Sequence, residues 1–441
     1  MSQQRPVHDL WPRGLMLRRG GAPAPPVEVV RPTTYEEVAE LLKSAGRGRT
    51  RVVPFGGASG VVGAVAVAPG QVGLDLGAFD RILAIDEHDL TVHAQAGVLG
   101  LDLEKALNAR GLTLGHHPSS LPAAAVGGLV ATRSSGQEST RHGSIEDMLL
   151  GLTVALPDGS LAHPRPGPRS AVGPALHQLL VGSEGGLGVI LDAVLRVHRR
   201  PASVVGRGWL FPAVETGLAA VREIVQRGLR PLVLRLYDPE DTLFQGVGEA
   251  GCLLVAAAAG EPEVAAAEAG VVARIAAGAR DLGVEPWERW LRHRYDLSPQ
   301  RLLDLLEPAG AYLDTIEIAA GWSALPAVYA EIKTALAAHS SVVLCHFSHA
   351  YEQGCCAYFT FAGSGADEPA ALAAYDDCWR KTMRICLARG ATISHHHGVG
   401  QARAAWARQE LAGWWPVWEA VRTALDPARV MNPNAVGGSV R

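Results

Sequence analysis

The sequence predicts an α+β protein of two domains, with a C-terminal segment that returns to the first domain. Residues 1–200 mix short strand-like apolar runs, helix-like stretches and many glycines. After the Arg-Arg-Pro sequence at 199–201, strand-like runs alternate with Ala-rich helices, which is typical of an α+β module built on a sheet. The length of 441 residues is enough for two or three domains. We therefore expect domains at 1–200 and 201–390, and a returning segment at 391–441.

The first domain contains an early helix start signal. Thr33-Thr34-Tyr35-Glu36 has the pattern of a capping box, which predicts Thr33 as the N-cap and Glu36 as the third helical residue. Apolar residues follow at helical spacing, at Val38, Leu41, Leu42 and Ala45. Later apolar runs predict strands at 51–55, 74–76, 91–98, 149–156 and 189–197.

The second domain and the C-terminal segment show a different texture. Strand-like runs at 232–237 and 252–257 are followed by an Ala-rich helical stretch at 263–283. Two further helices are predicted at 368–389 and 403–425. Four tryptophans near the C-terminus are expected to pack between helices rather than to form a lipid-contact belt: Trp406, Trp414, Trp415 and Trp418.

Composition excludes several classes of function. Hydrophobic residues make up 48% and charged residues 19%, which indicates an ordered globular chain. The formal net charge is -4 and no long basic run occurs, so we expect no nucleic-acid partner. The six cysteines form no CxxC pair, the N-terminus lacks a signal-peptide core, and no apolar run reaches transmembrane length. We expect a cytoplasmic protein, with peripheral membrane contact left open.

Glycine-bearing segments are the clearest sign of a ligand. Glycine permits close backbone approach, and exposed backbone N–H groups can hold a pyrophosphate. Any one such segment fits an ordinary tight turn, but four of them with interleaved Ser and Thr favour a dinucleotide site. None of the four matches GxGxxG at the start of a helix, or the Walker A pattern. The segments are PFGGASGV at 54–61, GHHPSS at 115–120, VGGLVATRSSG at 126–136 and GSEGGLGVI at 182–190.

The order and spacing of these segments resemble the vanillyl-alcohol-oxidase/p-cresol-methylhydroxylase flavoprotein family over nearly the whole chain. The resemblance implies a two-domain, non-Rossmann FAD-binding fold with an α+β cap domain for the substrate. The Asp426–Pro433 stretch resembles the closing segment of that family. The implied FAD contacts are Pro54, Phe55, Gly56, Gly57, Ala58, Ser59, Gly60, Val61, Pro118, Ser119, Ser120, Gly127, Gly128, Thr132, Arg133, Ser134, Ser135, Glu184, Gly185, Gly186, Leu187, Gly188, Val189 and Ile190.

One subgroup of the family, the alkyldihydroxyacetonephosphate synthases (alkylglycerone-phosphate synthases), is similar in its motifs. SHHHGVG at 394–400 resembles the triple-histidine signature of this subgroup. SHAYEQGCCAYFTF at 348–361 and PLVLRLYD at 231–238 resemble its tyrosine-bearing and arginine-bearing strands. The resemblance implies catalytic roles for seven residues: Tyr358, His395, His396, His397, Arg235, His116 and Arg301.

The subgroup's reaction is a transfer in ether lipid biosynthesis. As the resemblance implies, an acyl group is exchanged for an alkoxy group through a flavin N5 adduct, without net redox. Tyr358 would handle the substrate proton, the histidine cluster and above all His396 would deprotonate the alcohol, and Arg235 would orient an anionic substrate. The alternative is an FAD-linked dehydrogenase or oxidase of a 2-hydroxy acid or small alcohol. A flavin-binding protein without catalysis would leave Tyr358 and the histidines without a role.

The same residues also have simpler interpretations. The three histidines could form a solvated loop, and Tyr358 could be a core aromatic of a strand. Arg235 lies in a strand where a buried charge needs a partner, either an anionic ligand or a structural carboxylate such as Asp238. Neighbouring imidazoles titrate near neutrality and suit proton transfer, which favours a functional role for the histidines.

Three further expectations concern the cofactor and the partners. The PFGGASGV loop has no His, Cys or Tyr for attachment, so we expect FAD to be bound non-covalently. The turn at 394–398 lacks the Glu that some metal-dependent dehydrogenases of the family carry, so we expect no catalytic metal. The substrate is expected to be a small or lipid-like molecule, and the protein a homodimer.

Overall fold

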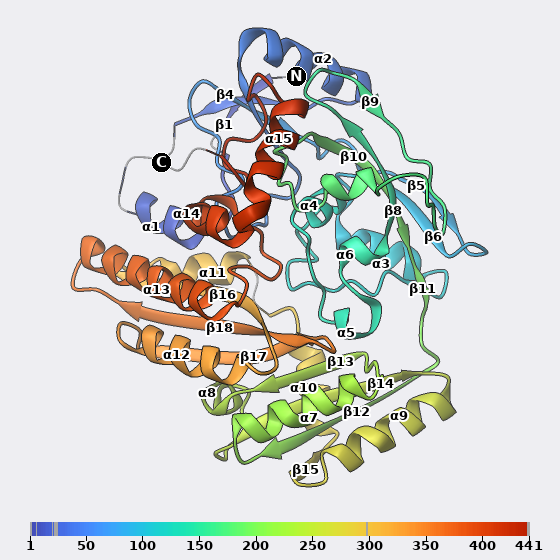
Figure 1. Cartoon of the computed structure of the whole chain (residues 1–441), viewed down its shortest axis with the longest axis vertical. Coiled ribbons are helices and arrows are strands. Elements are labelled where there is room, and N and C mark those ends of the chain that lie inside the picture. The colour runs from blue at the N-terminus through green and yellow to red at the C-terminus, as the bar shows by residue number, and fades with distance from the viewer. Residues whose placement is uncertain (1, 6, 20, 22–24, 297–298, 439–441) are drawn as a thin grey trace. The chain divides into compact units, whose positions relative to one another are not determined.

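The computed structural model describes residues 2–5, 7–19, 21, 25–296 and 299–438 (Figure 1). The chain divides into two compact units. Unit 1 contains Met1–Ser134, Ser144–Arg199 and His396–Arg441, and unit 2 contains Ser135–Gly143 and Arg200–His395. The short stretch Ser135–Gly143 therefore leaves unit 1 to join unit 2, and the C-terminal segment returns to unit 1.

Unit 1 is built on two main sheets. The first has the order β1(Ser2–Arg5)-β2(Val27–Val30)-β4(Gln71–Asp75)-β3(Arg51–Phe55), with β2 and β3 parallel to β4. The second is antiparallel, with the order β5(Ile82–Asp86)-β6(Thr91–Gln95)-β10(Val189–Arg196)-β8(Leu149–Ala155)-β9(Leu161–Ala162). The apolar runs predicted from the sequence therefore form strands, with ends that differ by a few residues.

Helices bury the apolar faces of these sheets. The helix α2(Tyr35–Gly48) packs Val38 and Leu42 against β3, β4 and β10 residues. The helices α3(Gly100–Asn108) and α4(Val126–Ala131) belong to a second core with β6, β8 and β10. The C-terminal helices α14(Gly400–Leu411) and α15(Trp415–Leu425) complete the unit.

The start of α2 lies one residue later than predicted. Thr34 is the N-cap, and its side chain accepts a hydrogen bond from the Glu37 backbone N–H at 3.2 Å. The Glu37 carboxylate accepts from the backbone N–H groups of Thr33 and Thr34 at 2.6 and 3.3 Å. Two threonines followed by two glutamates offer two registers, and the register with Glu37 satisfies one more backbone donor.

Unit 2 is a seven-stranded antiparallel sheet. The order is β15(Arg280–Gly283)-β12(Ser203–Phe211)-β14(Cys252–Gly260)-β13(Val233–Tyr237)-β17(Val342–Ala350)-β18(Gly354–Ser364)-β16(Ala311–Gly321). The helices α7(Val214–Gln226) and α9(Pro262–Ile275) lie against β12 and β14. The helices α12(Leu325–Ala337) and α13(Glu368–Arg389) lie against the strands β16 and β18 at the other end. This sheet positions most of the polar residues discussed below.

Two predicted helices were too long. The stretch 263–283 ends as a helix at Ile275, and Arg280–Gly283 forms the edge strand β15. The stretch 403–425 is divided at Ala412, whose φ of 44° ends α14, and Pro416 lies in the first turn of α15. Glycine at 278 and 413 weakens helix continuation at both breaks.

The helices of the described residues lack the character of a membrane span. The helix α13 has 22 residues but carries charged side chains near its middle, at Asp376, Asp377, Arg380 and Lys381. None of the described helices is both long and apolar enough to cross a membrane.

Candidate active site

In the glycine segments of unit 1, the backbone lies so close to neighbouring residues that some glycine positions leave no space for a side chain. The segment at 54–61 begins with the last two residues of β3, and its Gly56 and Gly57 lie against residues 123–125. A Cβ on Gly57 would overlap the carbonyl oxygen of Ala123, and one on Gly56 would lie 2.6 Å from the Cβ of Ala125. A residue with a side chain would overlap backbone at Gly57 and would displace Ala125 at Gly56, so the close approach of these segments requires glycine at both positions.

Glu184 joins the fourth glycine segment to the start of the C-terminal segment. Its buried carboxylate accepts hydrogen bonds from the backbone N–H groups of Val399 at 2.8 Å and Gly400 at 3.0 Å, at the start of α14. Asn432 donates to the carbonyl oxygens of Glu184 at 2.7 Å and Ala64 at 3.0 Å. These contacts hold the two segments and the Asn-Pro closing sequence together within unit 1.

Burial raises the pKa of Glu184 to about 7, because desolvation outweighs the hydrogen bonds and the charge of Arg403 that favour the ionised form. A carboxyl whose pKa is raised on folding stabilises the fold fully below its ordinary pKa and loses that contribution as pH rises through the folded value. We expect Glu184→Gln to remove this pH dependence. The wild type should lose about 3 kcal/mol of unfolding free energy relative to the variant between pH 4.5 and 8. Urea unfolding of both proteins across that range is the measurement, and parallel curves would contradict the expectation.

His116 is a buried residue of unit 1 with an unfilled hydrogen-bonding position. Its Nε2 lies 3.2 Å from the Ser134 hydroxyl, while its buried Nδ1 has no hydrogen-bond partner among the described residues. Burial lowers the pKa of His116 to about 3, so the imidazole is neutral. The Nδ1 of His116 thus lacks a partner among the described residues, and His116 contacts Ser134, an implied FAD contact. Together with the glycine segment at 54–61, this fits a bound group that has polar ring atoms of its own.

The sheet of unit 2 brings together Arg235, His346 and Tyr358. His346 on β17 is the register partner of both Tyr237 on β13 and Tyr358 on β18. Its ring stacks on the ring of Tyr358 with centroids 4.7 Å apart and planes at 16°. Arg235 donates from Nη2 to Nε2 of His346 at 2.6 Å. Three strands thus place a cation, an imidazole and a phenol in one row, which we name the Arg-His-Tyr row.

His346 in this row is neutral. Burial and then the charge of Arg235 lower its pKa to about 4, against the opposing effect of Asp241. Nε2 accepts from Arg235, so the ring proton lies on Nδ1, which faces the Asp241 carboxylate at 3.5 Å. Sequence reasoning assigned His346 no catalytic role, because only the pairing of the strands brings it to Arg235.

Asp238 is not the partner of Arg235. It is fully buried and pairs with Lys333, and it also caps the helix α8(Pro239–Phe244) through the Asp241 backbone N–H. The Nε of Arg235 is buried and has no hydrogen-bond partner within the described residues, and the guanidinium carries no carboxylate contact there. The cation is therefore open to an anionic ligand, which was the other alternative.

Burial raises the pKa of Tyr358 above its ordinary value, while the charge of Arg235 acts in the opposite direction. The phenol is therefore protonated at neutral pH. Opposite Tyr358 on β16 lies Glu317, which is fully buried. Glu317 accepts hydrogen bonds from the Ser394 hydroxyl at 2.9 Å and from the His395 backbone N–H at 3.3 Å. The start of the triple-histidine turn is thereby fixed to the same sheet as Tyr358.

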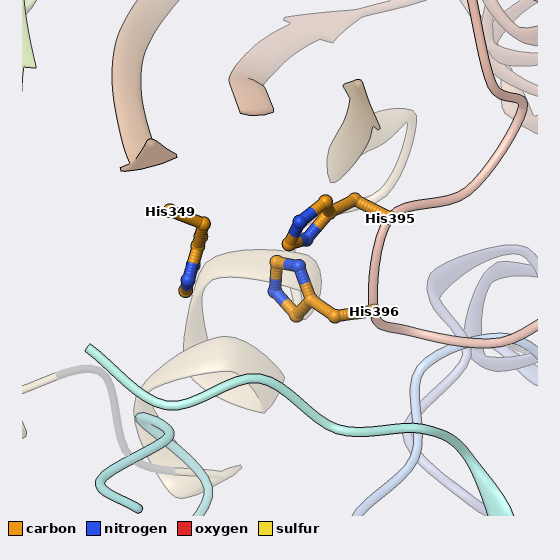
Figure 2. Close-up of side chains that lie close together, drawn as sticks. All are labelled: His349, His395 and His396. Carbon is orange, nitrogen blue, oxygen red and sulfur yellow. The ribbon is translucent and has the colours of Figure 1, made fainter. Parts of the chain in front are cut away.

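The rings of His395 and His396 lie close to the ring of His349 (Figure 2). The rings of His349 and His395 have centroids 4.9 Å apart, and Nε2 of His395 lies 2.8 Å from the Tyr351 hydroxyl. His349 also meets the Ser139 hydroxyl through Nδ1 at 2.6 Å. Ring nitrogens of His349, His395 and His396 all lie within 4.8 Å of one another, an arrangement that could hold a metal ion. From the sequence we expect no catalytic metal, because the turn at 394–398 lacks a Glu, and no local pattern indicates that His349 lies beside these histidines.

Other predicted residues lie elsewhere in the two units. His397 contacts His396, with ring centroids 4.5 Å apart. Arg301 is exposed on the helix α11(Pro299–Leu306) of unit 2. Trp414 is 72% exposed at the turn between α14 and α15, whereas Trp406, Trp415 and Trp418 are half-buried. Trp418 packs against the second core of unit 1, as expected, whereas Trp414 does not pack in this way.

Comparison with known proteins identifies both parts of the chain. The FAD binding domain family matches residues 26–164, and the family described as FAD linked oxidases, C-terminal domain, matches residues 200–436. Alkyldihydroxyacetonephosphate synthase of Dictyostelium discoideum is 30% identical over 458 residues, covering 95% of this chain and 74% of the relative. The uncharacterized FAD-linked oxidoreductase YgcU of Escherichia coli K12 is 31% identical over 432 residues, covering 93% of this chain and 89% of the relative.

Solved structures agree with these matches. A structure of alkyldihydroxyacetonephosphate synthase superposes with a TM-score of 0.76 at 26% identity, covering 92% of this chain and 75% of that one. p-Cresol methylhydroxylase superposes with a TM-score of 0.77 at 15% identity, covering 94% and 89%, which shows a shared fold. The predicted two-domain α+β fold is confirmed. The chain belongs to the family of FAD-linked oxidases with the vanillyl-alcohol-oxidase type of FAD-binding fold, and it is an FAD-dependent enzyme.

Proposed function

We propose that the enzyme exchanges the acyl group of an acylated dihydroxyacetone phosphate for an alkoxy group, as an alkyldihydroxyacetonephosphate synthase-like transferase. The observation that carries the proposal is the Arg-His-Tyr row, in which a guanidinium without a carboxylate partner among the described residues and a proton-bearing phenol both contact His346. A substitution at carbon that starts from a phosphorylated substrate needs a cation for the anion and a group that takes and returns a carbon-bound proton. The relatives named alkyldihydroxyacetonephosphate synthase support the choice.

The reaction balances without an external oxidant. The carbon–oxygen bond to the departing carboxylate breaks, a carbon–oxygen bond to the alcohol forms, and the alcohol proton leaves with the acid. FAD, when bound, would supply the electron-pair sink and source that such a substitution requires. Residues 54–61 and 182–190, together with His116, would hold it.

The residues of unit 2 take the proton and orient the substrate. Arg235 binds an anionic substrate group, since its guanidinium lacks a carboxylate partner within the described part of the chain. The charge of Arg235 partly offsets the larger effect of burial on the pKa of Tyr358, which eases loss of the phenol proton before Tyr358 accepts the proton of a C–H group. His346, neutral and stacked on Tyr358, holds both neighbours in place without competing for the proton.

The triple-histidine turn activates the incoming alcohol. His395 and His396 present ring nitrogens close to His349, and Glu317 fixes the backbone from which they extend. His396 is our choice for the base, because the Nε2 of His395 is engaged by the Tyr351 hydroxyl. Two separate proton-transfer groups match the two half-reactions, release of the acid and attack of the alcohol.

The direct test follows both product and flavin. Purified protein is incubated with acyl-dihydroxyacetone phosphate and a fatty alcohol, and product mass is measured together with flavin absorbance. We expect an ether product and no net flavin reduction at completion. Steady reduction of an external electron acceptor by a hydroxy acid, without any ether, would show a dehydrogenase instead.

A dehydrogenase of a 2-hydroxy acid or small alcohol is the second candidate. The grouping of His349, His395 and His396 favours it, because imidazole nitrogens at this spacing could hold a divalent ion that polarises a hydroxyl. The likeness to an FAD-linked oxidoreductase is compatible with it.

We expect no metal requirement for the transferase reaction. Elemental analysis of the purified enzyme should find zinc and manganese well below one equivalent, and treatment with a chelator should leave ether formation unchanged. A stoichiometric metal whose removal abolishes turnover would contradict this expectation and favour the second candidate.

We also expect the FAD to be non-covalent. The segment PFGGASGV at 54–61, which would contact the FAD, contains no side chain that commonly attaches flavin covalently. Precipitation with acid should release all of the yellow chromophore into the supernatant. Flavin that stays on the protein pellet would show a covalent bond elsewhere in the chain.

A further inference from the structure

A cavity of about 300 Å³ lies within unit 1, at the beginning of β3 and the end of α15. Its charged lining consists of Arg51, Glu419, Arg422 and Arg429, and glycines 437 and 438 border it on the C-terminal side. Its residues include none of those assigned above to FAD or to the Arg-His-Tyr row. We name this site the triple-arginine cavity.

Two buried donors lack acceptors among the described residues, one on Arg422 in the lining of this cavity and one on the neighbouring Trp418. Arg422 is 6% exposed, and although its Nη1 donates to the Gly437 carbonyl, its Nε has no hydrogen-bond partner among the described residues. The Nε1 of Trp418 is buried and unpartnered in the same way. A Cβ built on Gly437 would lie 2.9 Å from Nε1 of Trp418, 3.0 Å from Nη1 of Arg422 and 3.1 Å from Oε1 of Glu419, so these three side chains border one spot. Buried donors without acceptors on two neighbouring side chains indicate that an acceptor atom belongs in this region.

Positive charge is in excess around this spot. Arg429 pairs with Glu419 at 2.8 Å, and Glu419 also lies 3.8 Å from Arg422. The side chain of Arg51 has no hydrogen bond or ion pair within the described residues. Three guanidinium groups thus face Glu419 and the buried Asp426, whose oxygens accept from the backbone N–H groups of residues 430 and 431. Among the described residues, these three guanidinium groups exceed the two carboxylates by one positive charge.

The backbone at Gly437 leaves space beside the donors of Trp418 and Arg422. Gly437 has a φ of 76°, and a side chain there would occupy the space beside the two donors. The neighbouring Arg429 also has a left-handed φ, of 53°, a conformation that costs free energy for a residue with a side chain.

We propose that the triple-arginine cavity binds an oxyanion of the phosphate class, either inorganic phosphate or a phosphate monoester. Guanidinium groups match the oxygens of phosphate through paired N–H donors. A phosphate group offers three or more acceptor oxygens, enough for Arg51, Arg422 and Trp418 together, whereas a carboxylate offers two. This site belongs to unit 1 and does not depend on the reaction proposed above.

Isothermal titration of the flavin-loaded enzyme with inorganic phosphate, in a chloride buffer at constant ionic strength, tests the site. We expect saturable binding that weakens about tenfold or more in Arg51→Gln, a variant of a half-exposed side chain with no partner to lose within the described residues. Trp418→Phe removes one N–H and little volume, and should also weaken binding. Arg47→Gln, an exposed position on α2, is the matched control and should bind as the wild type does.

The outcomes separate the site from other anion effects. Unchanged affinity in both Arg51→Gln and Trp418→Phe would overturn the proposal, and so would an equal loss in Arg47→Gln, which would indicate general screening. Repeating the titration in Arg235→Gln removes the substrate cation of unit 2, and phosphate binding at the triple-arginine cavity should persist. Ether formation measured in parallel reports on the proposed function separately.

Two sources could provide the phosphate group, and a second comparison distinguishes them. Glycerol 3-phosphate is titrated as a free monoester, and vesicles of phosphatidylcholine with and without phosphatidic acid are tested by flotation. Arg51-dependent binding of glycerol 3-phosphate indicates a soluble ligand, whereas Arg51-dependent flotation only with phosphatidic acid indicates a lipid headgroup. Binding of neither, with no Arg51-dependent phosphate binding, contradicts the site.

Discussion

Tyr358→Phe is expected to lower ether formation by about 10²-fold or more, the range of a lost general base. Phenylalanine keeps the ring that stacks on His346 and removes only the hydroxyl, so the strands β17 and β18 should remain paired. Flavin content and thermal stability should therefore stay near the wild-type values. The measurement is kcat/KM for ether formation, with the far-ultraviolet circular dichroism spectrum as the control for folding.

A companion variant separates the two half-reactions. In Tyr358→Phe we expect release of the fatty acid to slow together with ether formation, since the substrate proton must leave first. In His396→Ala the acid should still be released once per enzyme, while ether formation falls because the alcohol is not deprotonated. Equal loss of acid release in both variants would mean that the two residues serve one step, and the assignment of roles would be wrong.

The sequence was sufficient to predict the strands β3, β4, β6, β8 and β10 of unit 1, because alternating or continuous apolar runs are local signals, whereas β1, β2, β5 and β9 of the same two sheets were not predicted. The strand predicted at 149–156 is β8 at Leu149–Ala155, and the helix predicted at 368–389 has the same ends in the structure. The breaks within 263–283 and 403–425 were missed, since alanine favours helix on both sides and only single glycines mark the interruption. Such short breaks are decided by the packing of the neighbouring elements.

Fewer of the contacts within the candidate site could be predicted from the sequence. Asp238 is close to Arg235 in the chain and was the natural structural partner, but alternation along β13 and the start of α8 direct Asp238 toward Lys333 instead. The residue that meets Arg235 is His346, which comes from a strand whose register no local pattern reveals. Carboxylates at positions 317 and 184 hold backbone N–H groups of distant turns, and such contacts carry no sequence signature.

The roles of the residues in the Arg-His-Tyr row can be separated by charge. Arg235→Gln removes the cation but keeps a side chain that can donate to Nε2 of His346. We expect kcat/KM for the phosphorylated substrate to fall by about 10²-fold, as when one preorganised donor to a developing or bound anion is lost. Arg235→Lys should recover part of this loss, because the charge returns without the planar fork that meets His346.

His346→Gln provides the contrasting case. Glutamine can still accept from Arg235, so the cation stays in place while the ring that stacks on Tyr358 is lost. A positioning role predicts a lower kcat with little change in KM, whereas Arg235→Gln should raise KM as well.

The neutral state of His346 leads to an expectation for the pH profiles of the wild type and of the His346→Gln variant. Because burial and Arg235 hold the pKa of His346 at about 4, protonation near that pH would place a second cation beside Arg235. Activity of the wild type should therefore fall as the pH approaches 4, and the His346→Gln variant, which has no group to protonate there, should show a shifted acid limb. An identical profile in both enzymes would show that His346 does not act on the reaction through this row.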